Sequence, residues 1–164
     1  MEKIISLSTL DIKLKKLLTL FIVVLTIGIT IGLIYLTLTT GTKISGIEEH
    51  YKGSTVIDEF DIPDKYPKTI NNLLLTTHNH LLSLSLIFLI MGGIFSFSTS
   101  IKSERLKSFL IYEPFFSIIL TFGGIWGIRY LHPIFLWVVI ISGTIMYSSF
   151  YFMAFISIFE LNRK

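Results

Sequence analysis

The sequence predicts an all-α integral membrane protein: a four-helix bundle that crosses the bilayer four times, with both termini in the cytoplasm. Of its 164 residues, 52% are hydrophobic and 15% charged, and the mean hydropathy is +0.73. A soluble domain of this length carries about a quarter charged residues and cannot bury so much apolar surface. The apolar residues also fall into four stretches, each close to the 20 or so residues that span the hydrocarbon core.

These stretches make one membrane domain of the whole chain, residues 1–164. The first follows Lys13, Lys15 and Lys16 and is longer than the apolar core of a signal peptide, which predicts a retained anchor. Its Gly28 and Gly32 predict close packing against another helix of the bundle. The connection 41–72 is long, whereas the other two are short, so the last three spans should pack as consecutive antiparallel hairpins. The predicted spans are residues 17–39, 73–97, 109–130 and 133–159.

The distribution of charge predicts the orientation. Positive residues gather in the amino-terminal segment, the second connection and the tail, which share one side of the membrane (Lys3, Lys13, Lys15, Lys16, Lys102, Arg105, Lys107, Arg163, Lys164). Cytoplasmic loops retain positive charge, so the acidic connection 41–72 should lie outside a bacterial inner membrane. The net charge of +3 then reflects topology, and nucleic acid is not an expected partner.

Several classes of chemistry are excluded or left without support. The chain has no cysteine, which excludes disulfides, thiolate metal sites, iron–sulfur clusters and covalently attached c-type haem. It has no Walker loop, dinucleotide fingerprint, HExxH motif or Ser–His–Asp arrangement, so nothing indicates a hydrolase or kinase. Whether the protein is an enzyme stays open at this stage.

The histidines are the most informative polar residues, because all four lie toward the predicted outer side. His78 and His80 are two residues apart on one span, roughly 200° around a helix, so they should not both face one ligand. Steps of seven residues from His78 pass through Ser85 and Gly92, whereas the face of His80 is mostly large and apolar. Small residues mark close helix contacts in bilayers, which predicts that His78 faces the bundle interior.

Converging imidazoles near a membrane surface favour a b-type haem, which needs one or two imidazoles on facing helices in an apolar slot. We predict His78 and His132 as the ligands, with His80 as the alternative. Arg129 would pair with the haem propionates, since guanidinium binds carboxylates in a bidentate manner. Room for the flat ring would come from small residues, namely Gly123, Gly124, Gly127 and Gly143. Another metal such as copper, or no cofactor at all, stays open.

Glu113 is a carboxylate inside the third span. It could take part in proton uptake or quinone binding, as carboxylates within membrane spans often do. The alternative, which we expect, is a carboxylate close enough to the interface to reach Lys107 or Arg105. Pro114 next to it should open or kink the helix, because proline lacks an N–H and clashes with the preceding turn.

The run LLTTHNHLL (residues 74–82), with YKG (51–53) and YLHP (130–133), resembles a group of uncharacterised four-helix bacterial membrane proteins. That resemblance implies a fold and no activity. More loosely, the plan is similar to small b-type cytochrome membrane subunits, which implies haem bound by histidines near helix ends. No span has a histidine at its cytoplasmic end, so the chain departs from the common two-haem pattern and one haem at most is expected.

The leading hypothesis is therefore a membrane electron-transfer subunit with one b-type haem near the outer face, part of a respiratory assembly. Its partners would be other membrane subunits, a periplasmic cytochrome or a quinone pool. The alternative is a cofactor-free accessory or scaffold subunit of a larger membrane complex. A transporter using Glu113 is less favoured, because four spans without inverted repeats do not match known transporter plans.

Overall fold

The computed structural model describes residues 6–41, 44–54 and 62–163. Several charged residues of the predicted cytoplasmic segments and of the connection 41–72 lie outside the described residues (Lys3, Lys43, Asp58, Glu59, Asp61, Lys164). The described chain forms a short 3-10 helix, η1 (Leu7–Thr9), and five α-helices, with no strand among these residues. The helices are α1 (Ile12–Thr40), α2 (Ile44–Lys52), α3 (Ile70–Ser96), α4 (Glu104–Tyr130) and α5 (Phe135–Leu161).

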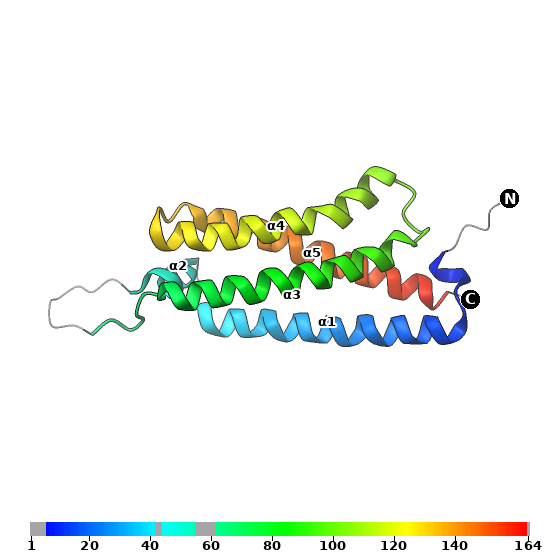
Figure 1. The fold of residues 1–164 in the computed structure, drawn as a ribbon, viewed down its shortest axis with the longest axis horizontal. Helices are drawn as coiled ribbons and strands as arrows, with labels where there is room; N and C mark the ends of the chain where they lie inside the picture. Colours follow the sequence, from blue (N-terminus) through cyan, green and yellow to red (C-terminus); the bar gives the residue numbers. More distant parts are fainter. Residues whose placement is uncertain (1–5, 42–43, 55–61, 164) are drawn as a thin grey trace.

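Four of these helices, α1, α3, α4 and α5, are long and apolar enough to cross a membrane, which confirms the four predicted spans. They lie side by side, and α1 begins at the same end of the bundle at which α5 ends (Figure 1). We call this the termini end and the opposite end the α2 end. The third span begins at Glu104 and not at Pro114, which lies inside one continuous helix; a kink at Pro114 stays a prediction.

Helix α2 lies in the connection that was predicted to be a loop. It is a short amphipathic helix: Ile47 and Tyr51, four residues apart, line a cavity of the bundle, while Glu48 and Lys52 form an exposed ion pair at 3.6 Å. Residues four apart share one face of a helix, so this period was the available signal. Gly41 ends α1 with a φ of 73°, in the left-handed region that glycine adopts freely.

Helices α4 and α5 form the closest contact in the bundle, as expected for a hairpin with a very short turn. A Cβ atom added to Gly127 would lie 2.4 Å from the Phe135 ring, and one added to Gly124 would lie 2.7 Å from Val139. These two glycines therefore let α5 approach α4, which corrects the expectation that they leave room for a haem.

Helix α1 is the most loosely held span. It packs along α5, where Thr30 Oγ1 and the Tyr151 hydroxyl lie 2.8 Å apart, and Ile22 is fully buried. Most of its other apolar side chains are exposed, as expected for lipid contact. A Cβ atom on Gly28 or Gly32 would meet nothing within 4 Å, so the predicted close packing at these glycines is wrong.

The termini end is closed by Glu160, which is 1% exposed. Its carboxylate accepts hydrogen bonds from the connection between α3 and α4: from the hydroxyls of Ser98 at 2.6 Å, Thr99 at 2.9 Å and Ser100 at 2.8 Å, and from backbone N–H groups of Thr99 and Ser100. Lys107 Nζ donates to the Ser98 carbonyl at 2.8 Å. We call Glu160 and Ser98–Ser100 the Glu160 cluster. It joins the end of α5 to that connection.

Candidate functional site

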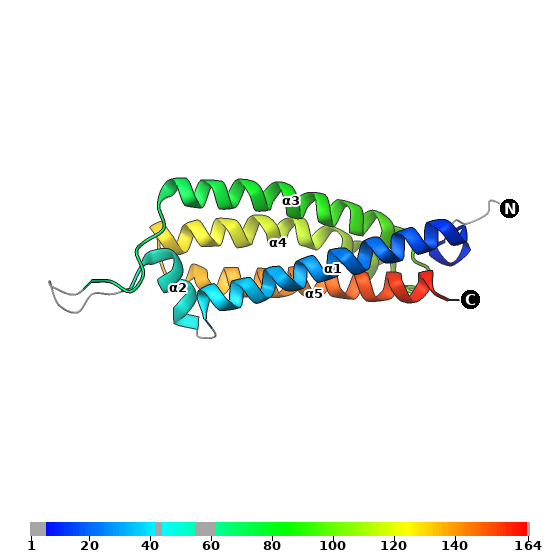
Figure 2. The ribbon, with the colours of Figure 1, turned by 90° about the horizontal axis from the view of Figure 1, so that it is seen from below.

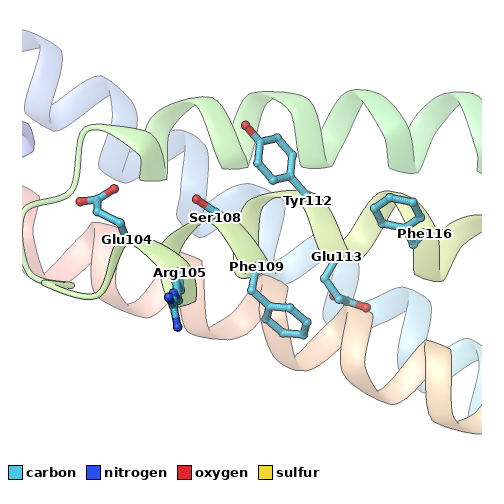
Figure 3. Close-up of a pocket in the computed structure, with 7 residues that line it drawn as sticks. All are labelled: Glu104, Arg105, Ser108, Phe109, Tyr112, Glu113 and Phe116. Carbon is cyan, nitrogen blue, oxygen red and sulfur yellow. The ribbon is translucent and has the colours of Figure 1, made fainter.

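A cavity of about 520 Å³ lies at the α2 end, lined by residues of all five α-helices. Helix α2 lies across this end of the bundle (Figures 1 and 2). A larger hollow of about 680 Å³ follows α4 near the termini end, but all seven of its lining residues belong to that one helix (Figure 3). That hollow is a groove open to lipid, so the α2-end cavity is the stronger candidate for a ligand site.

The cavity is amphipathic. Its apolar wall comes chiefly from the deeper turns of α3, α4 and α5, among them Leu84, Phe122, Ile125 and Met146. Polar side chains are a second part of the lining and include imidazoles, phenols, an ammonium group and an amide (Thr39, His50, Tyr51, Lys68, Asn72, Thr76, His80, Thr121, Tyr147). Ligand sites in proteins combine such apolar walls with a small number of polar groups.

His80 is the imidazole that α3 contributes to this cavity. Its Nδ1 lies 2.8 Å from the Thr76 carbonyl oxygen. A carbonyl only accepts hydrogen bonds, so in the neutral ring Nδ1 carries the proton and Nε2 keeps a free lone pair. The Phe122 ring of α4 lies 5.3 Å from the His80 ring.

The rotation of α3 that brings His80 to the cavity is fixed by a neighbouring contact. Trp126 Nε1 donates to the Thr77 hydroxyl at 3.0 Å. Thr77 and His80 are three residues apart and share a face of α3, just as Trp126 and Phe122 share a face of α4. The face of α3 that carries His80 is thereby turned toward α4.

His50 is the imidazole that α2 contributes to the same cavity. Burial, together with the Lys68 and Lys65 ammonium groups, lowers the pKa of His50 below its ordinary 6.5, against a smaller opposing effect of a hydrogen bond with the Thr39 backbone. The ring is therefore neutral near pH 7. Burial also raises the pKa of the adjacent Tyr51 to about 12, with a further contribution from Tyr147.

The segment before α3 holds Lys68 at the cavity. The Lys68 N–H donates to the Tyr51 carbonyl at 3.1 Å, which ties this segment to α2. The Lys68 carbonyl accepts from Arg129 Nε at 3.1 Å. The Arg129 guanidinium also lies over the Tyr130 ring, 5.0 Å from its centre. Arg129 therefore positions the backbone of Lys68, and the Lys68 side chain rather than that of Arg129 lines the cavity.

The prediction that His78 faces the bundle interior is wrong. Both histidines are exposed, but His78 lines none of the cavities and grooves described here, whereas His80 lines two of them. His132 lies in the exposed turn after α4, where its Nδ1 accepts from the Ile134 N–H at 3.1 Å. The cavity thus brings together His50 and His80, and not His78 and His132. No group of three His, Cys, Asp or Glu residues gathers anywhere in the described ranges.

Glu113 does not make the interfacial ion pair that we expected. Its carboxylate accepts hydrogen bonds from the hydroxyls of Ser117 and Ser149, the latter at 3.0 Å. Lys107 instead bonds to the Ser98 carbonyl, and the Glu48–Lys52 pair is the one ion pair in the part of the chain that the structure describes.

The cavity has open walls at two glycines. Gly32 of α1 and Gly143 of α5 line it, and a Cβ atom on either would meet nothing within 4 Å. Gly143 thus keeps its predicted place beside free space. A groove of about 380 Å³ between α1 and α3 shares Gly32, His80 and Tyr147 with the cavity, so the cavity continues toward the middle of the membrane between these two helices.

The sequence analysis placed His50 among the outer-side histidines but gave it no ligand role, and it missed Lys68. The spacing of Ile47 and Tyr51 would have predicted a helix that faces the bundle, and His50, next to Tyr51, would then lie near its buried face.

Comparison with known families matches residues 41–164 to the Aq_1264_TM model, described as a transmembrane helical domain. The matched segment holds α2 to α5 and thus both cavity histidines. This agrees with the resemblance to uncharacterised four-helix membrane proteins. No curated protein and no solved structure matches the chain.

Proposed function

The chain belongs to this transmembrane helical domain family, and we propose that it is a membrane electron-transfer protein that holds one b-type haem in the α2-end cavity. His80 of α3 and His50 of α2 are the residues that would hold the haem. This proposal keeps the haem expected from the sequence and replaces the ligand pair His78 and His132.

The observation that carries the proposal is the presence of two imidazoles from different helices in one amphipathic cavity. A b-type haem takes its axial ligands from histidines on facing elements of a bundle. Metal-ligating histidines almost always donate their second ring nitrogen to a carbonyl or carboxylate. His80 has this arrangement with the Thr76 carbonyl at 2.8 Å, which leaves Nε2 for the iron.

The remaining residues that line the cavity also suit a haem. The volume of about 520 Å³ lies within the roughly 300–1,000 Å³ of small-molecule and cofactor sites. Gly32 and Gly143 leave flat, open walls, and Phe122 offers an aromatic face. The Lys68 ammonium is the cationic partner for the propionates, in place of the Arg129 guanidinium predicted from the sequence.

The chain's own groups have distinct roles in this account. The Thr76 carbonyl holds the His80 ring in one tautomer and orientation. The lowered pKa of His50 keeps its ring neutral, which is the form that binds a metal. Helix α2 covers the cavity and carries the second ligand, so binding and closure of the site are coupled.

Haem, when bound, supplies one-electron chemistry. The excess of positive residues at the termini end predicts that the cavity lies near the outer face of a bacterial inner membrane. We propose that a periplasmic cytochrome or the quinone pool exchanges electrons there, within a respiratory assembly of several membrane subunits.

The test is an ultraviolet–visible spectrum of the detergent-purified protein, expressed with added haem and recorded oxidised and dithionite-reduced. We expect a Soret band and sharp reduced α and β bands. His80→Ala should lose the bound haem. His50→Ala should retain less haem and give a five-coordinate spectrum.

The matched control is His78→Ala, two residues away on the same helix and outside the cavity lining, which should keep the wild-type spectrum. His132→Ala should do the same. A colourless wild-type protein that co-purifies in stoichiometric amount with membrane partners would contradict the haem proposal and favour the cofactor-free accessory subunit.

A second candidate function is binding of an isoprenoid quinone in the same space. The groove between α1 and α3 favours it, because it continues the polar-lined cavity as an apolar slot open to lipid. Its walls include Leu25, Ile29 and Ile87, which suit a hydrocarbon tail. A colourless protein from which organic solvent extracts stoichiometric quinone, lost in His80→Ala, would support this candidate over haem.

A further inference from the structure

We infer that Glu113 is a proton-binding site inside the membrane that takes up a proton when the ligand in the α2-end cavity is reduced. A row of hydroxyl groups between α4 and α5 links Glu113 to this cavity. This inference rests on the proposed function for its trigger, but the proton site itself stands on separate contacts.

Glu113 is the carboxylate that lies deepest in the four spans. The other two, Glu104 and Glu160, lie at the first residue of α4 and in the last turn of α5. Nine residues separate Glu104 from Glu113, which places Glu113 about 13 Å farther along the helix axis. Ionisable residues at such depth are costly and usually serve ion or proton transfer.

The surroundings of Glu113 supply hydroxyls rather than a cation. Ser117 and Ser149 donate to its two carboxylate oxygens, and both serines are buried. A hydroxyl group both donates and accepts hydrogen bonds, so this pair can stabilise the carboxylate and also the carboxylic acid. Packing alone would need only alanine at these positions.

A groove connects Glu113 to charged side chains at the start of α4. Glu104, Arg105, Ser108 and Tyr112 line the same hollow as Glu113 (Figure 3). In Figure 3, Glu113 and Arg105 point to the same side of α4, and Tyr112 points to the opposite side. Glu104, Arg105 and Ser108 thus place polar side chains along α4 between the termini-end interface and Glu113.

In the other direction, hydroxyls continue toward the cavity. One turn beyond Ser117, the buried hydroxyls of Thr121 and Ser142 lie 2.7 Å apart across the α4–α5 contact. Thr121 also lines the α2-end cavity. Glu113, Ser117 and Thr121 follow one another at intervals of four residues and share one face of α4, so the row runs from Glu113 through Ser117 to Thr121.

The proton balance is simple. When an electron enters the cavity, the Glu113 carboxylate binds one proton and becomes the neutral acid; oxidation releases the same proton. Other titratable groups nearby are Glu104, Arg105 and Tyr112 on α4, and Tyr147 and Tyr151 on α5, of which Tyr151 is bonded to Thr30. Helix α3 carries no titratable residue after His80.

The experiment is redox-induced infrared difference spectroscopy of the haem-loaded protein, in H2O and D2O. We expect a carboxylic acid C=O band that appears on reduction and is lost in Glu113→Gln. Its control, Glu104→Gln, should retain the band. Ser149→Ala should shift the band, because the acid loses a hydrogen-bond partner, while Ser148→Ala, at the exposed neighbouring position, should not. Circular dichroism and size exclusion check that each variant folds.

The outcomes separate this inference from the haem proposal. Bound haem with no such band, or with a band that survives Glu113→Gln, overturns the inference and leaves the haem proposal standing. If the wild-type protein binds no haem, the proposed function fails, and a pH-difference spectrum of the haem-free protein tests the proton site alone. A titrating C=O band lost in Glu113→Gln supports the site, and its absence overturns it.

Discussion

The two ends of the bundle use polar residues in opposite ways. At the termini end, the Glu160 cluster buries a carboxylate among serine and threonine donors that satisfy it. At the α2 end, imidazole, phenol and ammonium groups line an open cavity. His80 Nδ1 is bonded to the Thr76 carbonyl oxygen of the same helix, which leaves Nε2 for a ligand. Satisfied buried groups hold a structure together, whereas groups turned to a cavity are available to a ligand. We therefore expect mutations at the two ends to separate stability from binding.

The largest expected effect is at the Glu160 cluster. Glu160→Ala removes the buried carboxylate that accepts from five donors and leaves these donors unpaired. The loss should reduce the free energy of unfolding by about 3–5 kcal/mol, measured by thermal unfolding in detergent. Glu104→Ala, at an exposed carboxylate of the same end, should change it by less than about 0.5 kcal/mol. Equal effects of the two substitutions would contradict a structural role for the cluster.

The next largest effect is expected at two glycines, Gly127 in the α4–α5 contact and Gly143 at the cavity wall. Gly127→Ala forces a Cβ atom against the Phe135 ring and should cost about 1–3 kcal/mol of stability through overpacking. Gly143→Ala places its methyl group in the open cavity, so its stability should change by less than about 0.5 kcal/mol while haem occupancy falls. A stability loss in Gly143→Ala as large as that in Gly127→Ala would show that the cavity wall is closed.

At the cavity itself, binding should respond more than stability. His80→Ala should weaken haem binding by at least about tenfold, the scale seen even for partners of metal ligands, and leave the unfolding temperature of the haem-free protein nearly unchanged. The comparison with His78→Ala, titrated with haem in detergent, measures the effect of ring position alone. If the two variants bind haem equally, His80 is not the ligand.

The smallest effect is a pH dependence at α2. The folded-state pKa of His50 is lowered below its ordinary 6.5, so the unfolded or opened state binds protons more readily. The contribution of neutral His50 to the packing of α2 on the bundle is then fully present above about pH 6.5 and is lost as the pH decreases below that value. Hydrogen exchange of α2 amides should increase between pH 7 and pH 5, after correction for intrinsic rates. His50→Gln should remove the change, and an unchanged pH response in that variant would exclude His50 as its cause.

The sequence predicted the spans well, because hydrocarbon thickness fixes the length of an apolar helix regardless of tertiary contacts. It failed at rotation about the helix axis. The stripe from His78 through Ser85 to Gly92 assumes a seven-residue repeat, but a straight helix drifts by about 20° per heptad. Gly92 is buried against Ile111, and over the two heptads back to His78 this drift adds up to about 40°.

The buried face of α3 instead carries large residues on the same side as His80, namely Leu84, Phe88, Met91 and Phe95. Small residues mark close helix contacts only where helices do approach, as at Gly124 and Gly127. Gly28 and Gly32 show the other outcome, an opening beside a loosely packed helix. The distance between two neighbouring helices decides whether a glycine marks a close contact or an opening. The residue pattern of a single helix does not contain that distance. The position of His50 at the cavity was not predicted for a related reason, since α2 is too short for its helical period to be recognised.

The most direct test of the account is the reduced-minus-oxidised visible spectrum of the wild-type protein beside His80→Ala and His78→Ala, each expressed with haem supplied. We expect sharp α and β bands in the wild-type protein and in His78→Ala, and their loss in His80→Ala. Bands that persist in His80→Ala and disappear in His78→Ala, or a wild-type spectrum with no haem at all, would contradict it.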